Sequence, residues 1–291
     1  MKRTCLFLLL AGLASLCAES PVLRLGSWNV QNYLLQNRWE ESRYRFQYPK
    51  PEGDKAALRN QLLRARPDIL FLQEIGSEAM LAEFREDLAV AGLDYSFAHF
   101  SALPDSRNGL AFLSMIAPEE VLHLDPREEP GRSTSLTRRG IQEVVLVLLE
   151  ARIRIFHVHL KSRYTSDAAD PDSRFFRTAE LETLKRMLDQ RLAISGMNET
   201  LLLVGDFNTP FESPLMNPLR EDWDSLPITD RQGQQWTYHY EKEGKFELLD
   251  GFWTNPVSVS AFLPVGLFPS GKDALAGSDH RLTVVDWAPL P

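Results

Sequence analysis

Short apolar runs alternate with amphipathic stretches along most of the chain. The clearest run is Leu201–Val204, which leads straight into Gly205-Asp206-Phe207-Asn208 and predicts a strand buried on both faces. Further strands are expected over 22–30, 68–74, 95–101, 109–116, 121–124, 141–150, 152–160, 236–240, 247–253 and 257–263. Apolar residues at helical spacing predict helices over 55–66, 78–91 and 174–194. The pattern indicates one domain of many strands with a few helices between them, without internal repeats.

Three long connections interrupt this pattern. Residues 31–53 form an aromatic and charged connection without clear periodicity, and connections of that length are more often functional than idle. Asp54 is expected to cap the helix that follows. Residues 125–140 and 264–278 are predicted loops, rich in Pro and Gly.

The composition is that of an ordinary globular protein. The 291 residues are 44% hydrophobic and 25% charged, with a formal net charge of -8. These totals argue against a broad basic face that grips duplex nucleic acid. They leave room for a local basic groove, or for an acidic metal pocket that binds phosphate through a cation.

The first residues have the form of a secretory signal peptide. Lys2 and Arg3 precede an apolar run from Cys5 to Leu16, followed by small residues. We therefore expect residues 1–18 to be removed on export to the periplasm or the extracellular space, with lipoprotein anchoring as the less favoured alternative. The remaining domain, residues 19–291, then has no cysteine, no stable membrane span, and is expected to be a monomer.

Several predicted strands end in polar residues that could share one site. They are Asn29, Glu74, His159, Asp206 with Asn208, Asp250, and Asp279 with His280. Taken singly, each could be a turn residue, a surface charge or a half-buried strand residue. A zinc pair at His157 and His159 lacks a third protein ligand. Together, the hard oxygen ligands suit Mg²⁺ or Mn²⁺, and histidines beside carboxylates suit acid–base chemistry on a phosphate ester.

Six stretches in order resemble the endonuclease/exonuclease/phosphatase superfamily, whose members include deoxyribonuclease I. They are Gly26-Ser27-Trp28-Asn29-Val30-Gln31-Asn32, Pro67 to Glu74, Asn108 to Ser114, His157-Val158-His159-Leu160-Lys161-Ser162, Gly205-Asp206-Phe207-Asn208 and Gly277-Ser278-Asp279-His280. The resemblance implies a four-layer α/β sandwich, with two mixed β-sheets packed face to face and helices outside. The site would lie at one end, where loops of both sheets meet.

The resemblance also implies roles for the matched residues. Mg²⁺, or Mn²⁺, would be held by Glu74 with Asn29 and Asp279. Asp206 would orient or deprotonate the attacking water, and Asn208 would hold water and phosphate. His280, tuned by Asp250, and His159 would contact the phosphate, with the division of acid and base roles left open. Expected substrate contacts are Arg107, Asn108, Arg139, His157, Lys161 and Arg163.

The departures from the family pattern guide the choice of substrate. His157 stands where many members have Asn, and only Asp250 carries over from the usual late strand. Signatures of inositol phosphatases and abasic-site enzymes are absent. We therefore expect a secreted metal-dependent phosphodiesterase, an endonuclease or exonuclease acting on nucleic acid with low sequence preference. Alternatives are a phosphatase or a sphingomyelinase-like phospholipid phosphodiesterase, for which 262–269 is a candidate exposed apolar hairpin although burial of this segment is favoured, and an inactive binding module.

Overall fold

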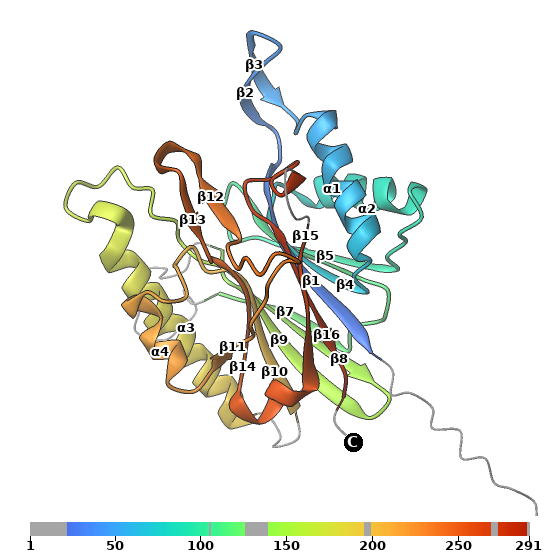
Figure 1. The fold of residues 1–291 in the computed structure, drawn as a ribbon, viewed down its shortest axis with the longest axis vertical. Coiled ribbons are helices and arrows are strands. Elements are labelled where there is room, and N and C mark those ends of the chain that lie inside the picture. The colour runs from blue at the N-terminus through green and yellow to red at the C-terminus, as the bar shows by residue number, and fades with distance from the viewer. Residues whose placement is uncertain (1–21, 105, 126–138, 195–198, 269–272, 290–291) are drawn as a thin grey trace, which may run out of the picture.

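Two six-stranded sheets pack face to face in the computed structural model, with helices on both outer faces (Figure 1). The structure describes residues 22–104, 106–125, 139–194, 199–268 and 273–289. This arrangement confirms the predicted four-layer α/β sandwich. The predicted signal peptide lies outside the described residues.

The first sheet has the strand order β15-β16-β1-β4-β6-β5. Its strands are β1 (Leu23–Tyr33), β4 (Ile69–Ile75), β5 (Phe97–Ser101), β6 (Gly109–Ser114), β15 (Phe262–Phe268) and β16 (Leu282–Trp287). β1 and β4 are parallel neighbours, so their carboxyl ends meet at one edge of the sheet.

The second sheet has the order β11-β14-β10-β9-β8-β7. Its strands are β7 (Glu120–Leu124), β8 (Ile141–Leu148), β9 (Ala151–His159), β10 (Glu199–Asp206), β11 (Asp224–Ser225) and β14 (Asp250–Thr254). β9 and β10 are parallel, while β14 runs antiparallel to β10 and places Asp250 opposite Asp206.

Three apolar clusters hold the layers together. The central one joins inward-facing residues of both sheets, including Phe71, Val204 and Trp287. A second packs the outer face of the first sheet against α1 (Glu52–Ala65) and α2 (Glu78–Val90). A third packs the second sheet against α3 (Arg174–Ile194) and α4 (Asn217–Arg220). The apolar runs of the sequence are therefore covered on both faces, as expected for buried strands.

Close packing of β9 against β10 depends on one glycine. Gly205 has a φ of 141°, and an added Cβ would lie 1.9 Å from the Val158 carbonyl oxygen. No other residue fits there, because both the backbone conformation and the space exclude a side chain. This glycine lets β10 deliver Asp206 next to the end of β9.

Some predicted elements were wrong. The 31–53 connection contains a hairpin of β2 (Gln36–Glu40) and β3 (Arg43–Tyr48), and it projects from the molecule beside α1 (Figure 1). The predicted strand over 247–253 is two elements, because β13 (Lys245–Glu247) pairs with β12 (Tyr238–Tyr240) and β14 begins separately at Asp250.

Two further corrections concern the residues at which predicted elements begin and end. The predicted strand over 257–263 is a 3₁₀ turn over Pro256–Ala261 followed by β15, which continues into the predicted loop to Phe268. β15 pairs with β16, so this segment is part of a sheet and not an apolar hairpin. Helix α1 begins after Pro51, and no side chain caps it, so Asp54 is not its cap. No helix in the described part of the chain is long and apolar enough to cross a membrane.

Candidate active site

Strands of both sheets bring six predicted side chains to one end of the sandwich. Asn29 and Glu74 come from β1 and β4, and His159 and Asp206 end β9 and β10. Asp250 begins β14, and His280 precedes β16. These residues are far apart in the sequence, and they meet because parallel neighbours end at the same edge of each sheet.

Asp206 is the centre of the group. It is fully buried, and its Oδ2 accepts a hydrogen bond from Asn29 Nδ2 at 2.9 Å. His159 Nε2 and His280 Nε2 lie 3.5 Å and 3.9 Å from the same oxygen. Burial, together with the negative charge of Asp250, raises the pKa of Asp206 to about 7. A carboxyl with this pKa can exchange a proton near neutral pH.

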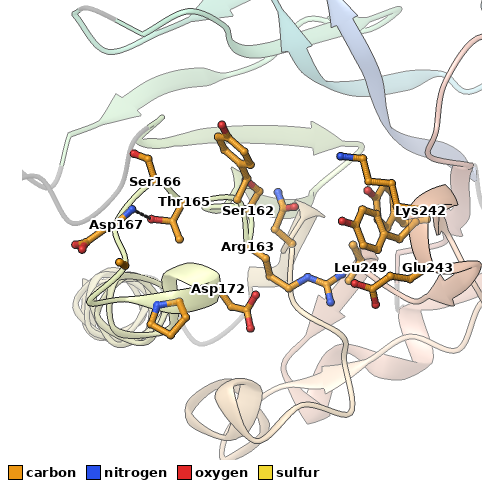
Figure 2. A pocket seen from close by; sticks show the side chains of 15 residues that line it. Ser162, Arg163, Thr165, Ser166, Asp167, Asp172, Lys242, Glu243 and Leu249 are labelled. Carbon is orange, nitrogen blue, oxygen red and sulfur yellow. Dashed lines mark hydrogen bonds between the residues drawn. The ribbon is translucent and has the colours of Figure 1, made fainter.

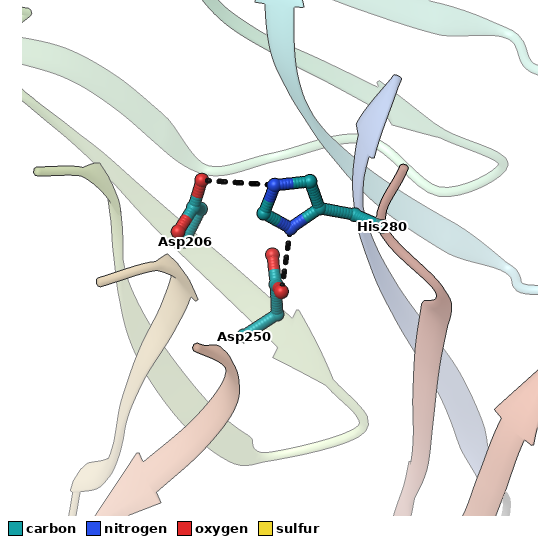
Figure 3. A group of neighbouring side chains, drawn as sticks. All are labelled: Asp206, Asp250 and His280. Carbon is teal, nitrogen blue, oxygen red and sulfur yellow. Dashed lines mark hydrogen bonds and ion pairs between the residues drawn. The ribbon is translucent and has the colours of Figure 1, made fainter. Parts of the chain in front are cut away.

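His280 lies between two carboxylates (Figure 3). Its Nδ1 pairs with Asp250 Oδ2 at 2.7 Å, and its Nε2 points toward Asp206. Burial alone would lower the pKa of His280, but the charges of Asp250 and Asp206 outweigh burial and raise that pKa well above its usual value. His280 is therefore an imidazolium at neutral pH, held in place by Asp250.

His159 differs from His280 in its surroundings. Burial lowers the pKa of His159 well below its usual value, and the charges of Arg139 and His280 lower it further. Its Nε2 points to Asp206 and lies 3.9 Å from Glu74 Oε1, whereas its buried Nδ1 has no hydrogen-bond partner among the described residues. The ring is thus neutral in the free protein, and it can donate one hydrogen bond into the centre of the group.

Glu74 interrupts β4. Its φ is 69°, in the left-handed region that non-glycine residues rarely adopt, and the pairing of β4 with β6 shifts register between Gln73 and Ile75. The carboxylate accepts hydrogen bonds from Asn32 N at 2.6 Å and Asn29 Nδ2 at 3.3 Å. This unfavourable backbone conformation at a polar residue is typical of functional sites.

Two groups of side chains could hold a divalent cation. Asp206, Asp250 and His280 offer ligand atoms within 4.8 Å of one another. His280 lacks a free lone pair while it is an imidazolium, so this group is better explained as a hydrogen-bonded triad.

The second group is the predicted one around Glu74. Burial raises the pKa of Asp279, the positive charge of His280 lowers it, and repulsion by the negative charge of Glu74 raises it. A hard divalent cation would relieve that repulsion. Asn29 Oδ1 already accepts a hydrogen bond from Gln31 N at 3.0 Å and keeps a second lone pair. Glu74 and Asp279, with Asn29, could therefore hold a hard divalent cation.

Asn208 lies beside Asp206 in a left-handed conformation with a φ of 48°. Its backbone N–H donates to Asp206 Oδ1 at 2.8 Å, and its side-chain amide donates to the Leu160 carbonyl at 2.9 Å. Arg177 of α3 fixes this turn, because its guanidinium donates to the Asn208 carbonyl at 2.8 Å and to Thr209 Oγ1 at 2.6 Å. A buried arginine thus anchors the loop that carries Asn208.

A sequence model of the Endonuclease/Exonuclease/phosphatase family matches residues 26–280, a span that includes every residue of this site. The chain belongs to this family. No curated protein matches the chain closely enough to be reported as a relative.

Solved structures share the fold at low sequence identity. Truncated Caenorhabditis elegans TDP2 is 17% identical with a TM-score of 0.62, over 92% of this chain and 97% of that one. The human nocturnin catalytic domain with bound sulfate is 18% identical with a TM-score of 0.62, over 92% and 95% of the two chains. Beta toxin from Staphylococcus aureus is 14% identical with a TM-score of 0.64, over 91% and 99%. These likenesses show the family fold.

Two predicted substrate contacts, Arg139 and Asn108, lie beside the end of β9. Arg139 Nη1 donates to the carbonyls of His159 and Leu160, at 3.4 and 3.2 Å. Its Nε donates to Asn108 Oδ1 at 3.4 Å. Arg139 and Asn108 thus support the end of β9 and place one cation beside His159.

The other predicted cations interact with groups outside the Asp206 group. Lys161 directs its ammonium to the Ser162 carbonyl at 2.7 Å and to that of Tyr164. Arg163 pairs with the Glu247 carboxylate through its two terminal nitrogens, Nη1 and Nη2. Arg107 contacts the Gln36 side chain at the base of the β2–β3 hairpin.

Arg163 lines a cavity of about 720 Å³ that reaches Asn208 (Figure 2). The cavity lies between the loop that follows β9 and the β12–β13 hairpin, whose Tyr238 and Tyr240 also line it. Its cations, Arg163 and Lys242, are balanced by nearby carboxylates. The cavity therefore adjoins the Asp206 group through Asn208.

His157 does not join the group, although it shares a face with His159. The ring is fully buried between the sheets, with Nδ1 3.1 Å from Gln142 Oε1 and Nε2 2.6 Å from Gln73 Nε2. It also packs edge-on against Phe71. A side chain enclosed in this way cannot touch substrate, so we assign His157 to the core.

Three residues near the site escaped the sequence reasoning. Lys50 is buried, donates to the Gln31 carbonyl at 2.9 Å, and has its pKa lowered by burial to about 8. Tyr238 packs its ring 4.7 Å from that of His280. Arg177 was assigned only to an amphipathic helix. Lys50 and Arg177 can be recognised because they are charged and buried. Burial of these residues cannot be determined from the sequence without the fold.

Proposed function

We propose that the protein is a divalent-metal-dependent phosphodiesterase that cleaves nucleic acid with low sequence preference. The convergence of His159 and His280 on one buried carboxylate, Asp206, carries this proposal. Neither a structural core nor a simple binding surface needs two histidines of different charge around a carboxyl with a pKa near 7.

The residues divide the chemistry as follows. Asp206 accepts the proton of the attacking water, which the Asn208 amide helps to position. His280, held as an imidazolium by Asp250, stabilises the negative charge that builds on a nonbridging phosphate oxygen. His159 donates its one hydrogen bond to a phosphate oxygen or to the leaving oxygen. Glu74 and Asp279 would hold a divalent cation, which when bound would supply Lewis-acid neutralisation of the phosphate.

Several observations favour this substrate class over the alternatives. Segment 262–268, the candidate lipid-facing hairpin, is a strand paired in the first sheet, with Phe262 and Leu267 buried and Leu263 exposed. All the side chains expected for catalysis are present and most converge, which argues against an inactive binding module. A neighbour of the same fold, nocturnin, binds sulfate, a tetrahedral anion like phosphate. Export by the predicted leader would place this activity outside the cytoplasm.

The test is a substrate and metal panel. Purified protein is incubated with plasmid DNA, RNA, sphingomyelin, inositol phosphates and bis(p-nitrophenyl) phosphate, in Mg²⁺, Mn²⁺, Ca²⁺ or EDTA. We expect nicking of plasmid DNA or cleavage of RNA with Mg²⁺ or Mn²⁺, none in EDTA, and recovery when Mg²⁺ is restored.

Matched variants separate the site from contaminating activity. Glu74→Gln removes the charge of the main metal ligand and keeps its shape, whereas Asp224→Asn makes a similar change on the exposed strand β11. Activity that persists in EDTA, or that survives Glu74→Gln, would contradict the proposal. Hydrolysis of sphingomyelin alone would replace nucleic acid with a phospholipid as substrate.

A further inference from the structure

The β2–β3 hairpin, residues 36–48, stands out from the sandwich (Figure 1). Its turn residues Glu41 and Ser42 both have positive φ, as in the type I′ turn that matches the twist of two paired strands. The arginines tie it down: Arg38 donates to the Asn32 and Leu34 carbonyls, and Arg45 pairs with Glu41. The hairpin is therefore a rigid extension of β1 and not a loose loop.

One face of this hairpin is aromatic and open to solvent. Trp39 lies directly opposite Tyr44 in the strand register, and Tyr44 packs edge-on against Phe46 at 5.0 Å. Directly opposed residues and residues two apart share a face, so the three rings form one surface. Trp39 is 70% exposed, Tyr44 52% and Phe46 75%. Large aromatic rings left in water together mark an interaction surface.

The composition of the hairpin distinguishes between partners. Its apolar residues are all aromatic, with no aliphatic side chain between positions 36 and 48. The remaining positions are Arg, Glu, Gln, Asn and Ser, and the tip is Glu41-Ser42. A charged tip without aliphatic neighbours opposes insertion into hydrocarbon, whereas exposed aromatic rings on one face can form a stacking platform for nucleobases.

Local charge agrees with a nucleic-acid partner. Arg38, Arg43 and Arg45 outnumber Glu40 and Glu41 in the hairpin, and Arg107 contacts its base through Gln36. The chain as a whole carries a net charge of -8. A locally cationic, aromatic projection on an acidic protein is complementary to a polyanion with exposed rings.

The hairpin is also continuous with the site. Arg38 Nη2 donates to the Asn32 carbonyl at 2.6 Å, and the backbone N–H of Asn32 donates to Glu74 Oε2 at 2.6 Å. On the other side, Arg107 adjoins Asn108, which Arg139 links to the end of β9. The base of the hairpin is therefore linked to the site through Asn32 on one side and Asn108 on the other.

From these observations we infer that the aromatic face of the hairpin, Trp39, Tyr44 and Phe46, is a stacking platform for the unpaired bases of a single-stranded nucleic-acid substrate. The inference rests on the proposed function and narrows its substrate to strands with exposed bases. Stacking tolerates any base, in keeping with low sequence preference.

The test measures binding separately from catalysis. A fluorescein-labelled oligothymidylate, a duplex of equal length and phosphatidylcholine vesicles are titrated with the purified protein in EDTA, which suppresses turnover. The triple variant Trp39→Ser/Tyr44→Ser/Phe46→Ser is compared with Phe175→Ser, which alters a ring 72% exposed on α3, outside the hairpin. We expect the triple variant to bind the oligothymidylate at least about 100-fold more weakly, and Phe175→Ser to bind it like wild type.

Hydrolysis of bis(p-nitrophenyl) phosphate with Mg²⁺ provides the independent readout. This small diester has no bases to stack in sequence, so the triple variant should cleave it at the wild-type rate, which also shows that it is folded. Unchanged oligothymidylate affinity in the triple variant overturns the inference, as does loss of vesicle binding alone, which would identify a membrane surface. Failure of wild type to hydrolyse the diester contradicts the proposed function, whatever the binding result.

Discussion

His157 and His159 lie two residues apart on β9, point the same way and are both buried, yet they belong to different regions of the molecule. His157 lies between the sheets, where both ring nitrogens have polar neighbours in Gln73 and Gln142. His159 lies at the end of the sandwich, faces two carboxylates, and leaves its Nδ1 without a partner among the described residues.

The difference shows how one fold separates stability from chemistry. Between the sheets, neutral polar groups pair with one another, which limits the cost of burying them. At the end of the sandwich, the His280 side chain and several carboxylates lie together. Some of their polar atoms, such as Asp250 Oδ1, have no hydrogen-bond partner among the described residues. Such a group is unfavourable for the free protein, and under the proposed function it would become complementary when phosphate and a metal are added.

The largest expected effect comes from the end region. Asp206→Asn should lower kcat on a phosphodiester by about 10²- to 10⁴-fold, because the proton acceptor is lost. Burial raises the pKa of Asp206 to about 7, so its ionised form destabilises the fold at neutral pH, and the variant should unfold at the same or a higher temperature. Steady-state rates and thermal melts on the same samples test both points, with Asp224→Asn as control.

An Asp206→Asn variant with normal kcat would remove Asp206 from the mechanism. A lower melting temperature would show that the carboxyl stabilises the fold.

His157→Leu tests the region between the sheets. It leaves the amides of Gln73 and Gln142 buried without their imidazole partner, which should lower the free energy of unfolding by about 2–4 kcal/mol. Denaturant unfolding of this variant and of His99→Leu, a half-buried histidine on β5, gives the comparison.

If His157 is structural, the kcat of the folded His157→Leu protein should change far less than that of Asp206→Asn. An equal loss of kcat would return His157 to the catalytic group.

The region between the sheets should also lose stability in acid. Burial lowers the pKa of His157 to about 3, against about 6.5 in an unfolded chain. At a pH between these two values, the unfolded chain binds a proton on His157 that the folded protein does not bind. The contribution of His157 to the free energy of unfolding is therefore complete above pH 6.5, and it is lost as the pH falls toward 3. The free-energy difference between wild type and His157→Gln should change by about 1.4 kcal/mol per pH unit in that window.

Urea titrations from pH 7 to pH 4 measure this slope. Parallel stability curves for wild type and His157→Gln would mean that the histidine accepts its proton within the fold.

The smallest effect is expected at the support of the site. Arg177→Met frees the loop of Asn208 and should reduce kcat about 10-fold, as is usual for residues that position others. Arg174→Met, one turn earlier on the exposed side of α3, is the matched control. If the loss appears in KM with kcat unchanged, then the loop serves binding of the ground state and not the reaction.

The sequence predicted most of the sandwich because its strands are apolar runs and its helices have apolar stripes. It missed the β2–β3 hairpin, since those strands alternate aromatic with charged residues and bury neither face. It missed the continuation of β15 to Phe268, because Pro264 and Gly266 resemble loop residues, although the strand bends past them through a shift in register.

For the site, the sequence determined which chemical groups are present and that strand ends such as Gly205-Asp206 deliver them. Only the tertiary structure decided which groups meet and in what charge state. The spacing of His157 and His159 on one strand face does not show that one is enclosed between the sheets and the other faces carboxylates, and the sequence does not show that His280 lies between Asp206 and Asp250. Those properties depend on burial and on charges brought together from distant strands, because a pKa is set by surroundings that a linear pattern does not contain.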